Sequence, residues 1–473
     1  MRRSPALMLI GILAFLMAIA AVAQPVEPEA TPGGELSPES VELPSVGLSM
    51  RFPSGTSITK NPQSTRRLVA VSEDQTWIAE ISVVRTTVDD ITISDLADGA
   101  IKTATEESET TTVRKHATLE INGQPAEQIT LQLRRKSGVQ ETRIHTIFKP
   151  APKTFVVHTF FCGADHAEKA LPLNEKSVQT IAFTSADEMA EQRIEALQAT
   201  DQALASLDEA KYRAMLAADR WFRIYRPLEG GGEDAIGYYN IREEIAPRGA
   251  VGKGRSPSSY SPSEREDGVL VSLVGRYKFN ENIVDVEIRA WMSFDRQQEA
   301  WTISSSAYER APDELRTGDP RRDYLYAGSS TLTGATNGGR ITIIVDDPPQ
   351  PKQEVVFQKS ADAYITQAEV YMLYRMLKPF QHQKYGMFAF EPSRQKLEYR
   401  TEVFERSGTD DRWTATQKRS LDSPPNTVTI DADGTIVRIV NSNGEVTVPS
   451  DADEIRRLGE SSGLPTVSLR RKR

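Results

Sequence analysis

The sequence predicts an α+β fold of two modules with largely antiparallel sheets, joined by a long helical segment. Runs rich in β-branched and aromatic residues alternate with turn signals through two long stretches of the 473-residue chain. Between these stretches, residues 186–220 are rich in Ala, Leu, Glu and Gln, with apolar residues at helical spacing. A chain of this length normally divides into two or more domains. We therefore expect domains at residues 43–185 and 221–459, with residues 186–220 as a helical connector.

The first 23 residues have the features of a secretory signal peptide. Two arginines follow Met1, an uninterrupted apolar run comes next, and Ala21-Val22-Ala23 has the small-x-small pattern that signal peptidase recognises. We expect cleavage after Ala23 and export to the periplasm or the extracellular space. A retained membrane anchor is the alternative, because the apolar run is near the lower length limit of a span, about 17–25 residues. The rest of the chain has no long apolar stretch, so we expect no integral membrane protein after cleavage.

Composition restricts the classes of partner and the chemistry that holds the fold. The net charge is -9 and the isoelectric point is about 5.4, which disfavours general affinity for nucleic acid. The single cysteine excludes an intramolecular disulfide, so apolar cores must hold both modules. Residues 24–42 are rich in Pro, Gly and Glu and are expected to form a disordered linker. Residues 460–473 end in LRRKR and are expected to form a basic disordered tail.

The first module is expected to begin with short strands and to end with a strand and a helix. Strand candidates include RRLVAVSED, WIAEISVVRTT, ETRIHTIFKP and KTFVVHTFF, with a polar helix at residues 94–108 between them. Asn122-Gly123 joins ATLEI to AEQITLQL and predicts a tight hairpin, because both turn residues need a positive φ. A helix is expected over residues 165–179, interrupted near Pro172, followed by TIAF.

The second module is expected to be built from successive strands. Candidates run from RWFRIYRP through AIGYYNIREEI, GVLVSLVGRYKF, NIVDVEIRAWMSF and EAWTISSSAYE to LEYRTEVFERS and TIVRIVNSNGEVTV. One helix-like segment, AEVYMLYRMLKPF, separates two groups of strands. Few helices stand between strands, so the sheet is expected to be mainly antiparallel.

The order of segments in the first module resembles the PsbP-like fold. The segments are GLSMRFPSG, WIAEISVV, an ING hairpin before LQL, TFVVHTFF followed by a helix, and SVQTIAF. The same fold family includes DcrB-type bacterial envelope proteins. The resemblance covers about a third of the chain and implies an accessory or binding module, without a catalytic set of residues.

The second module resembles bacterial exported proteins with a curved, half-barrel sheet, such as the lipoprotein carrier LolA. The segments that carry this resemblance are WFRIYRPLEGGGEDAIGYYNIREEI and the TVTIDADGTIVRI hairpin, over about half of the chain. The resemblance implies a concave face that holds an acyl chain. Charged strands such as VDVEIRAWMSF and LEYRTEVFERS depart from this pattern, because a wholly apolar cavity would not contain them.

The stretch HTFFCGADHAEK places the only cysteine between two histidines. In a strand, His158 and Cys162 would lie roughly 13 Å apart, too far for one metal ion to bind both. A helix would bring them together, but the β-branched and aromatic run before Cys162 favours a strand. Cys162 with His166 at the start of the next helix remains an alternative, as a thiolate with a lowered pKa. We interpret Cys162 as a small buried side chain at a strand end.

Other motif-like stretches lack the spacing that their chemistry needs. Ser57-Ile-Thr-Lys60 matches S-x-x-K without SDN or KTG elements. The stretch from Gly249 to Ser256 has the composition of a phosphate loop without its spacing, so we expect a mobile loop there. Asp431-Ala-Asp-Gly434 fits a hairpin turn better than a calcium loop, because Val440 stands where the last calcium ligand would be glutamate. NSNG at 441–444 is also expected to be a turn.

Two pairs of acidic residues lie on or beside predicted strands. They are Glu243-Glu244 and Asp346-Asp347. Adjacent strand residues point to opposite faces, so neither pair forms a natural acid-base dyad.

These observations predict an exported, non-enzymatic envelope protein that binds a lipid-like ligand, a peptide or another envelope protein. We expect no catalytic residues, no metal ligands and no cofactor; the oligomeric state is left open. An enzyme of unrecognised type, such as a carboxylate-based hydrolase in the second module, and a purely structural assembly factor are the alternatives. Aromatic residues of the second module are the candidate ligand contacts, namely Trp221, Tyr238, Tyr239, Trp291, Trp301, Tyr371 and Tyr374.

Overall fold

The chain divides into two compact units, which we call the N-terminal and the C-terminal unit. The computed structural model describes residues 35–61, 64–88, 90–279, 282–316, 323–337, 339–359, 363–377, 383–407, 411–462 and 464. The N-terminal unit comprises the described residues up to Ile194 together with Leu421–Pro424. The C-terminal unit comprises Glu195–Ser420 and the described residues from Pro425 onward. The predicted signal peptide and most of the predicted basic tail lie outside the described residues.

The end of the predicted disordered linker contributes to the N-terminal unit. Leu36 forms an isolated antiparallel bridge with Pro53. A strand, β1, begins at Val41 and continues to Leu43, where the side chain is fully buried. In residues 35–42, backbone pairing therefore replaces the expected disorder, because Leu43 and the residues after it join the core of this unit.

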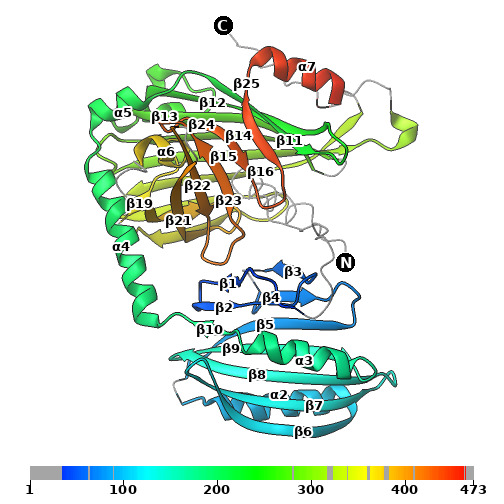
Figure 1. The fold of residues 1–473 in the computed structure, drawn as a ribbon. Coiled ribbons are helices and arrows are strands. Elements are labelled where there is room, and N and C mark those ends of the chain that lie inside the picture. Colours follow the sequence, from blue (N-terminus) through cyan, green and yellow to red (C-terminus); the bar gives the residue numbers. More distant parts are fainter. Residues whose placement is uncertain are drawn as a thin grey trace. The chain divides into compact units, whose positions relative to one another are not determined.

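The N-terminal unit is built on an antiparallel sheet of seven strands (Figure 1). In order across the sheet, these strands are β3 (Ser57–Lys60), β4 (Arg66–Val71), β5 (Trp77–Arg85), β9 (Thr154–Gly163), β8 (Gln140–Ala151), β7 (Gln124–Arg135) and β6 (Ser108–Ile121). A small second sheet contains β1, β2 (Leu48–Met50) and β10 (Ala182–Phe183).

The two faces of the seven-stranded sheet carry separate apolar cores. On one face, Val156, Phe160 and Cys162 of β9 pack with residues of α3 (Ala167–Val178) and of the small sheet. On the other face, Phe155 packs with residues of α2 (Ile93–Glu107). Alternate residues of one strand point to opposite faces, so β9 supplies both cores.

The predicted hairpin at Asn122-Gly123 is confirmed. Asn122 has φ 49° and Gly123 has φ 80°, and Ile121 of β6 pairs with Gln124 of β7. The turn therefore has two residues with positive φ, as the Asn-Gly pair predicts. The helix predicted over residues 165–179 forms as α3, but Pro172 lies inside it without ending it.

Two helices occupy most of the predicted connector. These are α4 (Ala186–Ala205), which crosses the boundary between the units, and α5 (Glu209–Met215). Ala199, Ala203 and Leu204 of α4 and the fully buried Tyr212 of α5 belong to the core of the C-terminal unit. The second half of the segment is thus part of the C-terminal core.

Within the described residues, fifteen strands form the one large sheet of the C-terminal unit. In order across the sheet, these are β18 (Gln353–Gln358), β17 (Arg340–Asp346), β16 (Tyr324–Asn337), β15 (Glu299–Arg310), β14 (Asn282–Met292), β13 (Asp267–Phe279), β12 (Glu233–Pro247), β11 (Arg220–Pro227), β25 (Val446–Ser450), β24 (Ile436–Val440), β23 (Asn426–Ile430), β22 (Arg412–Lys418), β21 (Lys396–Ser407), β20 (Lys384–Glu391) and β19 (Tyr364–Ile365). The pairings are antiparallel except for that of β19 with β20. A further helix, α7 (Ala452–Ser462), follows β25.

The large sheet bends round its main core. Trp301 of β15 stacks on Phe390 of β20 with ring centroids 5.2 Å apart, although nine strands separate β15 from β20 in the sheet order. Figure 1 shows β22 and β23 in front of β14 to β16 in this unit. Apolar side chains from both halves of the sheet fill the space between them, together with those of α4, α5 and α6 (Leu373–Met376).

The helix predicted over AEVYMLYRMLKPF is shorter than expected. It forms a 3-10 turn, η5 (Glu369–Tyr371), and the four-residue α6. The buried Glu369 side chain accepts a hydrogen bond from the Thr366 backbone N–H at 2.8 Å, which fixes the start of the turn. Leu377 then adopts an extended backbone.

The structure confirms the predicted α+β class, with strands predominating in large antiparallel sheets. No helix in the described part of the chain combines the length and the apolarity that a membrane span requires.

Candidate functional site

The loop between β12 and β13 folds into a defined structure on the C-terminal unit. It contains three 3-10 helices, η1 (Arg248–Val251), η2 (Pro257–Ser259) and η3 (Pro262–Arg265). This differs from the mobile loop that the glycine- and serine-rich sequence predicts. The difference arises from tertiary contacts, because Ala250 and Val251 pack on the buried residues Ala246, Leu270 and Trp291.

Tyr260 fixes this loop from within. Its side chain is buried, and a Cβ atom placed on Gly249 would approach its ring to 2.7 Å, so only glycine fits beneath the ring. The Arg255 guanidinium lies 5.5 Å from the centre of the same ring. The Arg265 Nε donates a hydrogen bond to the Tyr260 carbonyl oxygen at 3.1 Å. The loop is therefore ordered by ring packing and by arginine contacts.

An open polar cleft of about 460 Å³ lies beside η1 and η3. Its lining combines guanidinium groups, serine hydroxyls, one carboxylate and glycine backbone, and consists of Arg248, Gly249, Val251, Gly252, Arg255, Ser261, Ser263, Glu264 and Ala300. This volume falls in the range of small-molecule pockets, about 300–1,000 Å³. We call this feature the η1–η3 cleft.

The two arginines of the cleft have different partners. Arg255 forms an ion pair with Glu264. The hydrogen bond from Arg255, and then the one from the Ser261 backbone N–H, lower the pKa of Glu264 to about 2. Arg248 Nη1 donates to the Gln298 side-chain oxygen at 2.8 Å, which uses one of the five N–H groups of a guanidinium. Two guanidinium groups and one carboxylate give the lining one net positive charge. The cleft is therefore suited to a small ligand that carries a carboxylate or phosphate group.

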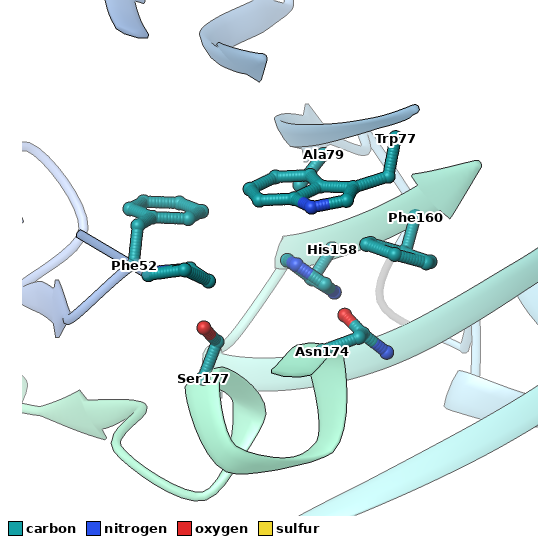
Figure 2. A pocket seen from close by; sticks show the side chains of 8 residues that line it. Phe52, Trp77, Ala79, His158, Phe160, Asn174 and Ser177 are labelled. Carbon is teal, nitrogen blue, oxygen red and sulfur yellow. The ribbon is translucent and has the colours of Figure 1, made fainter. Parts of the chain in front are cut away.

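A second feature is a small buried cavity in the N-terminal unit. Its volume is about 10 Å³, which is room for about one water molecule. The lining residues come from the segment after β2, from β5, from β9 and from α3, and are Phe52, Pro53, Trp77, Ala79, His158, Phe160, Asn174 and Ser177. Figure 2 shows the His158 ring between aromatic rings and the polar ends of Asn174 and Ser177. We call this feature the His158 cavity.

Strand and helix periodicity bring the polar residues of this cavity together. His158 lies on β9 between Ile81 of β5 and Thr146 of β8 in the sheet register. Asn174 and Ser177 are three residues apart on α3, so both side chains lie on the same side of the helix. Burial, and then the neighbouring His145, lower the pKa of His158 to about 4. His158 is therefore neutral near pH 7.

The structure places the histidines and the cysteine of HTFFCGADHAEK at separate positions. His158 and Cys162 both lie on β9, which confirms the predicted strand. Burial, with Glu141 and Asp165 nearby, raises the pKa of the Cys162 thiol to about 11, which argues against a reactive thiolate. His166 precedes α3, and its Nε2 atom lies 3.4 Å from Asp165 Oδ2. Among the described residues, no three His, Cys, Asp or Glu side chains are grouped so as to hold a metal ion.

The other motif-like stretches lie in simple structural elements. Ser57 to Lys60 form β3, so the serine of S-x-x-K does not open a helix. Asp431–Gly434 connects β23 to β24 as predicted, and the Asp431 side chain accepts a hydrogen bond from the Thr435 backbone N–H at 2.8 Å. NSNG forms the turn between β24 and β25.

The acidic pairs are divided between buried and exposed positions. Glu243 is buried and accepts hydrogen bonds from Arg220 and from Arg375, the latter at 2.5 Å, whereas Glu244 lies beside exposed Arg242. Asp346 forms an ion pair with Lys352 at 2.8 Å. Asp347 is buried, and burial followed by repulsion from Asp346 raises its pKa. Neither pair points into a common site.

Three further buried carboxylates of the C-terminal unit are held by specific donors. Glu369 accepts from Arg296 and Tyr212, both at 2.6 Å. Glu402 accepts from Arg400 at 3.0 Å. Glu299 accepts from the Tyr364 hydroxyl at 2.5 Å, and burial raises its pKa.

The seven candidate aromatic residues do not share one face of the large sheet. Trp301, Tyr374, Tyr239 and Tyr371 belong to the main core or pack against it. Trp291 lies in a separate cluster beneath the η1–η3 loop, and its indole N–H donates to the Ala246 carbonyl at 3.0 Å. Trp221 and Tyr238 contact each other with ring centroids 6.5 Å apart. Ligand contact by these residues stays a prediction.

Sequence reasoning discussed His158 and the stretch from Gly249 to Ser256, but it assigned no binding role to either and did not identify the other polar residues of the two sites. The η1–η3 cleft brings Arg248 and Arg255 together with Ser261, and the run GKGRSPSSYSPSER was the available signal. Asn174 and Ser177 gave a weaker signal, because two polar residues at i and i+3 interrupt the apolar face that this helix buries.

No protein-family model and no curated protein sequence match this chain. Solved structures with a partial likeness exist. PsbP of the cyanobacterium Synechocystis sp. PCC 6803 is 10% identical over 33% of this chain and 98% of its own, with a TM-score of 0.27. The Ran-binding protein Mog1p of Saccharomyces cerevisiae is 11% identical over 33% of this chain and 99% of its own, with a TM-score of 0.26. A β-barrel-like protein of the domain of unknown function DUF1849 from Brucella abortus is 11% identical over 50% of this chain and 98% of its own, with a TM-score of 0.32.

These likenesses are weak in both identity and TM-score, and they concern the fold alone. PsbP is thus a weak structural neighbour of about a third of the chain, and the DUF1849 protein of about half. The resemblances to DcrB-type proteins and to LolA stay predictions.

Proposed function

We propose that this chain is an exported, non-enzymatic binding protein whose C-terminal unit binds a small ligand with a carboxylate or phosphate group in the η1–η3 cleft. The observation that carries the proposal is the cleft itself, about 460 Å³ in volume and lined by Arg248, Arg255 and serine hydroxyls. Guanidinium groups bind carboxylates and phosphates through charge-assisted, often bidentate hydrogen bonds. The loop that builds the cleft is held by Tyr260 before any ligand arrives, so binding would cost little ordering entropy.

The packing of the large sheet favours this surface cleft over an interior site for an acyl chain. Trp301 and Phe390 stack across the interior, and both are buried. An acyl chain between these two halves of the sheet would have to displace packed aromatic rings, at the cost of the contacts that they make. The packing of the C-terminal unit therefore supports a small polar ligand better than a lipid-like one.

The buried carboxylates also favour binding over hydrolysis. A catalytic acid-base pair needs two acids that reach a common substrate. Glu243 and Glu369 are each held by arginines, and Glu299 by neutral donors. The carboxylate hydrolase hypothesis therefore has no specific observation in its favour.

Native mass spectrometry of the chain recovered from a bacterial periplasm tests export and binding together. We expect the mass of residues 24–473, because cleavage follows Ala23, and a small polar adduct rather than an acyl chain. Recovery of only the uncleaved chain in the membrane fraction would reject cleavage and favour the retained anchor. An acyl-chain adduct released by organic extraction would instead indicate that the ligand binds in the interior of the large sheet.

A thermal-shift screen with small carboxylates, inorganic phosphate and amino acids tests the cleft directly. A compound that binds raises the melting temperature of the full chain, because it stabilises only the folded state. We expect Arg248→Ala to abolish the shift and Arg242→Ala to retain it, since Arg242 is an exposed arginine of β12 that pairs with Glu244. A shift that persists in Arg248→Ala, or no shift with any compound, would contradict the proposed site.

A further inference from the structure

The His158 cavity gathers buried polar atoms that lack partners. Both ring nitrogens of His158, Asn174 Oδ1 and Ser177 Oγ have no hydrogen-bond partner among the described residues. His158 is fully buried, and Asn174 and Ser177 are 4% and 2% exposed. Leaving a buried donor or acceptor unsatisfied destabilises the fold, so nearly all such groups in folded proteins are paired. Four unpaired atoms at one small cavity therefore indicate a ligand.

The chemistry of these groups defines that ligand. A neutral imidazole offers one donor and one acceptor, an amide oxygen accepts, and a hydroxyl both donates and accepts. A partner for all of them must itself donate and accept. The remaining walls, Phe52, Trp77 and Phe160 among them, are apolar, which disfavours a charged ligand.

The size of the cavity restricts the ligand further. A volume of about 10 Å³ accommodates about one water-sized probe. A water molecule donates two hydrogen bonds and accepts two, and buried waters typically make about three hydrogen bonds. A transition metal typically takes several imidazole, thiolate or carboxylate ligands, and the cavity offers one imidazole, one amide and one hydroxyl.

We propose that the His158 cavity is a built binding site for one water molecule, which links His158 on β9 to Asn174 and Ser177 on α3. The water supplies hydrogen bonds between the helix and the sheet at a place where apolar packing alone leaves polar groups unsatisfied. It thereby fixes the position of α3 against the sheet. The site lies in the N-terminal unit and shares no lining residue with the η1–η3 cleft of the C-terminal unit.

The sign of a stability change tests this proposal. In a hydrated site, Ser177→Ala removes a hydrogen bond to the water, and we expect the folded-to-unfolded ratio of this unit to fall about fivefold. In a dry cavity, the same change removes an unsatisfied hydroxyl and raises helix propensity, so the ratio would rise. Asn174→Leu makes the same distinction, because leucine keeps the branched side-chain skeleton of asparagine, forms no hydrogen bonds and has a higher helix propensity.

Cys162 provides a local measurement in the full chain. It is the only cysteine, is buried on β9, and becomes reactive when the N-terminal unit unfolds. Pulse labelling of this thiol along a urea series gives the unfolded fraction of the unit. Glu175→Ala is the matched control, since Glu175 lies on the exposed side of α3, and we expect its ratio to stay within about twofold of the unmodified chain.

A high-resolution crystal structure of the full chain gives the second readout. We expect one water within hydrogen-bond distance of a His158 ring nitrogen, Asn174 Oδ1 and Ser177 Oγ. A rise in the folded-to-unfolded ratio for both Ser177→Ala and Asn174→Leu would overturn the proposal. Electron density that shows a dry cavity, or an occupant other than water, would overturn it as well.

Discussion

Adjacent residues of this chain have opposite roles, and Glu243 and Glu244 are the clearest case. Glu243 is fully buried between Arg220 and Arg375, while the Glu244 side chain is 35% exposed beside Arg242. On a strand, one residue of such a pair must face the interior. The sequence predicts the division into two faces, but the tertiary structure decides which glutamate is buried, because both arginine partners come from other elements.

Glu243→Gln should destabilise the C-terminal unit strongly. Removing the carboxylate leaves two guanidinium groups at a buried site without their countercharge, and breaking a buried pair typically costs about 3–5 kcal/mol. Glu244→Gln is the matched control and should cost less than about 1 kcal/mol, since its ion pair is exposed. Urea unfolding followed by tryptophan fluorescence measures the difference, because Trp221, Trp291, Trp301 and Trp413 lie in this unit. Equal costs for the two variants would refute this assignment.

At the scale of elements, local chemistry determines where several turns and helices occur. Thr92 and Asp95 form a capping box at the start of α2, with the Thr92 backbone N–H donating to Asp95 Oδ2 at 2.8 Å. The predicted hairpin at Asn122-Gly123 and the predicted polar helix near residues 94–108 both form. Such elements are predictable because their stabilising contacts lie within a few residues.

Two glycines of the N-terminal unit should respond to alanine in opposite ways. Neither Gly99 nor Gly123 has an atom within 4 Å of the position where Cβ would stand, so packing does not distinguish them. Gly99 lies inside α2, and Gly99→Ala should raise the free energy of unfolding by about 0.5–1 kcal/mol. Gly123 has φ 80°, and Gly123→Ala should lower it by about 1 kcal/mol or more.

Pulse labelling of Cys162 in urea measures both glycine variants within the full chain. The two changes add the same methyl group and differ only in backbone conformation. A stabilising effect of Gly123→Ala would show that the hairpin does not need a positive φ at this position.

The η1–η3 loop shows where prediction at the element scale ends. Its composition is typical of an irregular mobile segment, yet Ala250 and Val251 pack on Trp291, and Tyr260 covers Gly249. These partners lie on β14 or several residues away along the loop. No short-range pattern could therefore predict the cleft or bring Arg248 and Arg255 into it.

At the scale of the whole molecule, buried histidines make stability depend on pH. Burial is the main cause that lowers the pKa of His145 and of His158 to about 4, from 6.5 when exposed. As the pH falls below 6.5, the unfolded chain therefore binds protons first, and stability is lost until the pH reaches about 4. Between pH 7 and pH 5 we expect each histidine to contribute a loss of roughly 2 kcal/mol.

Urea midpoints from Cys162 labelling at pH 7 and pH 5 measure this loss, with the labelling pulse always applied at one pH. His145→Gln should reduce the pH dependence, because it removes one of the two buried groups. His166→Gln is the control for loss of a histidine as such, since His166 is exposed. An N-terminal unit equally stable at both pH values would show that these histidines titrate alike in the folded and unfolded chain.

The sequence by itself determined the α+β class, the antiparallel sheets, the Asn122-Gly123 hairpin and the strand that contains His158 and Cys162. These features follow from alternation, helical spacing and turn residues, which act over a few positions. The tertiary structure alone decided that Glu243 meets Arg375, that Trp301 meets Phe390, and that His158 faces Asn174 and Ser177. The physical reason is that these contacts join segments distant in sequence, whose approach depends on how whole sheets and helices pack.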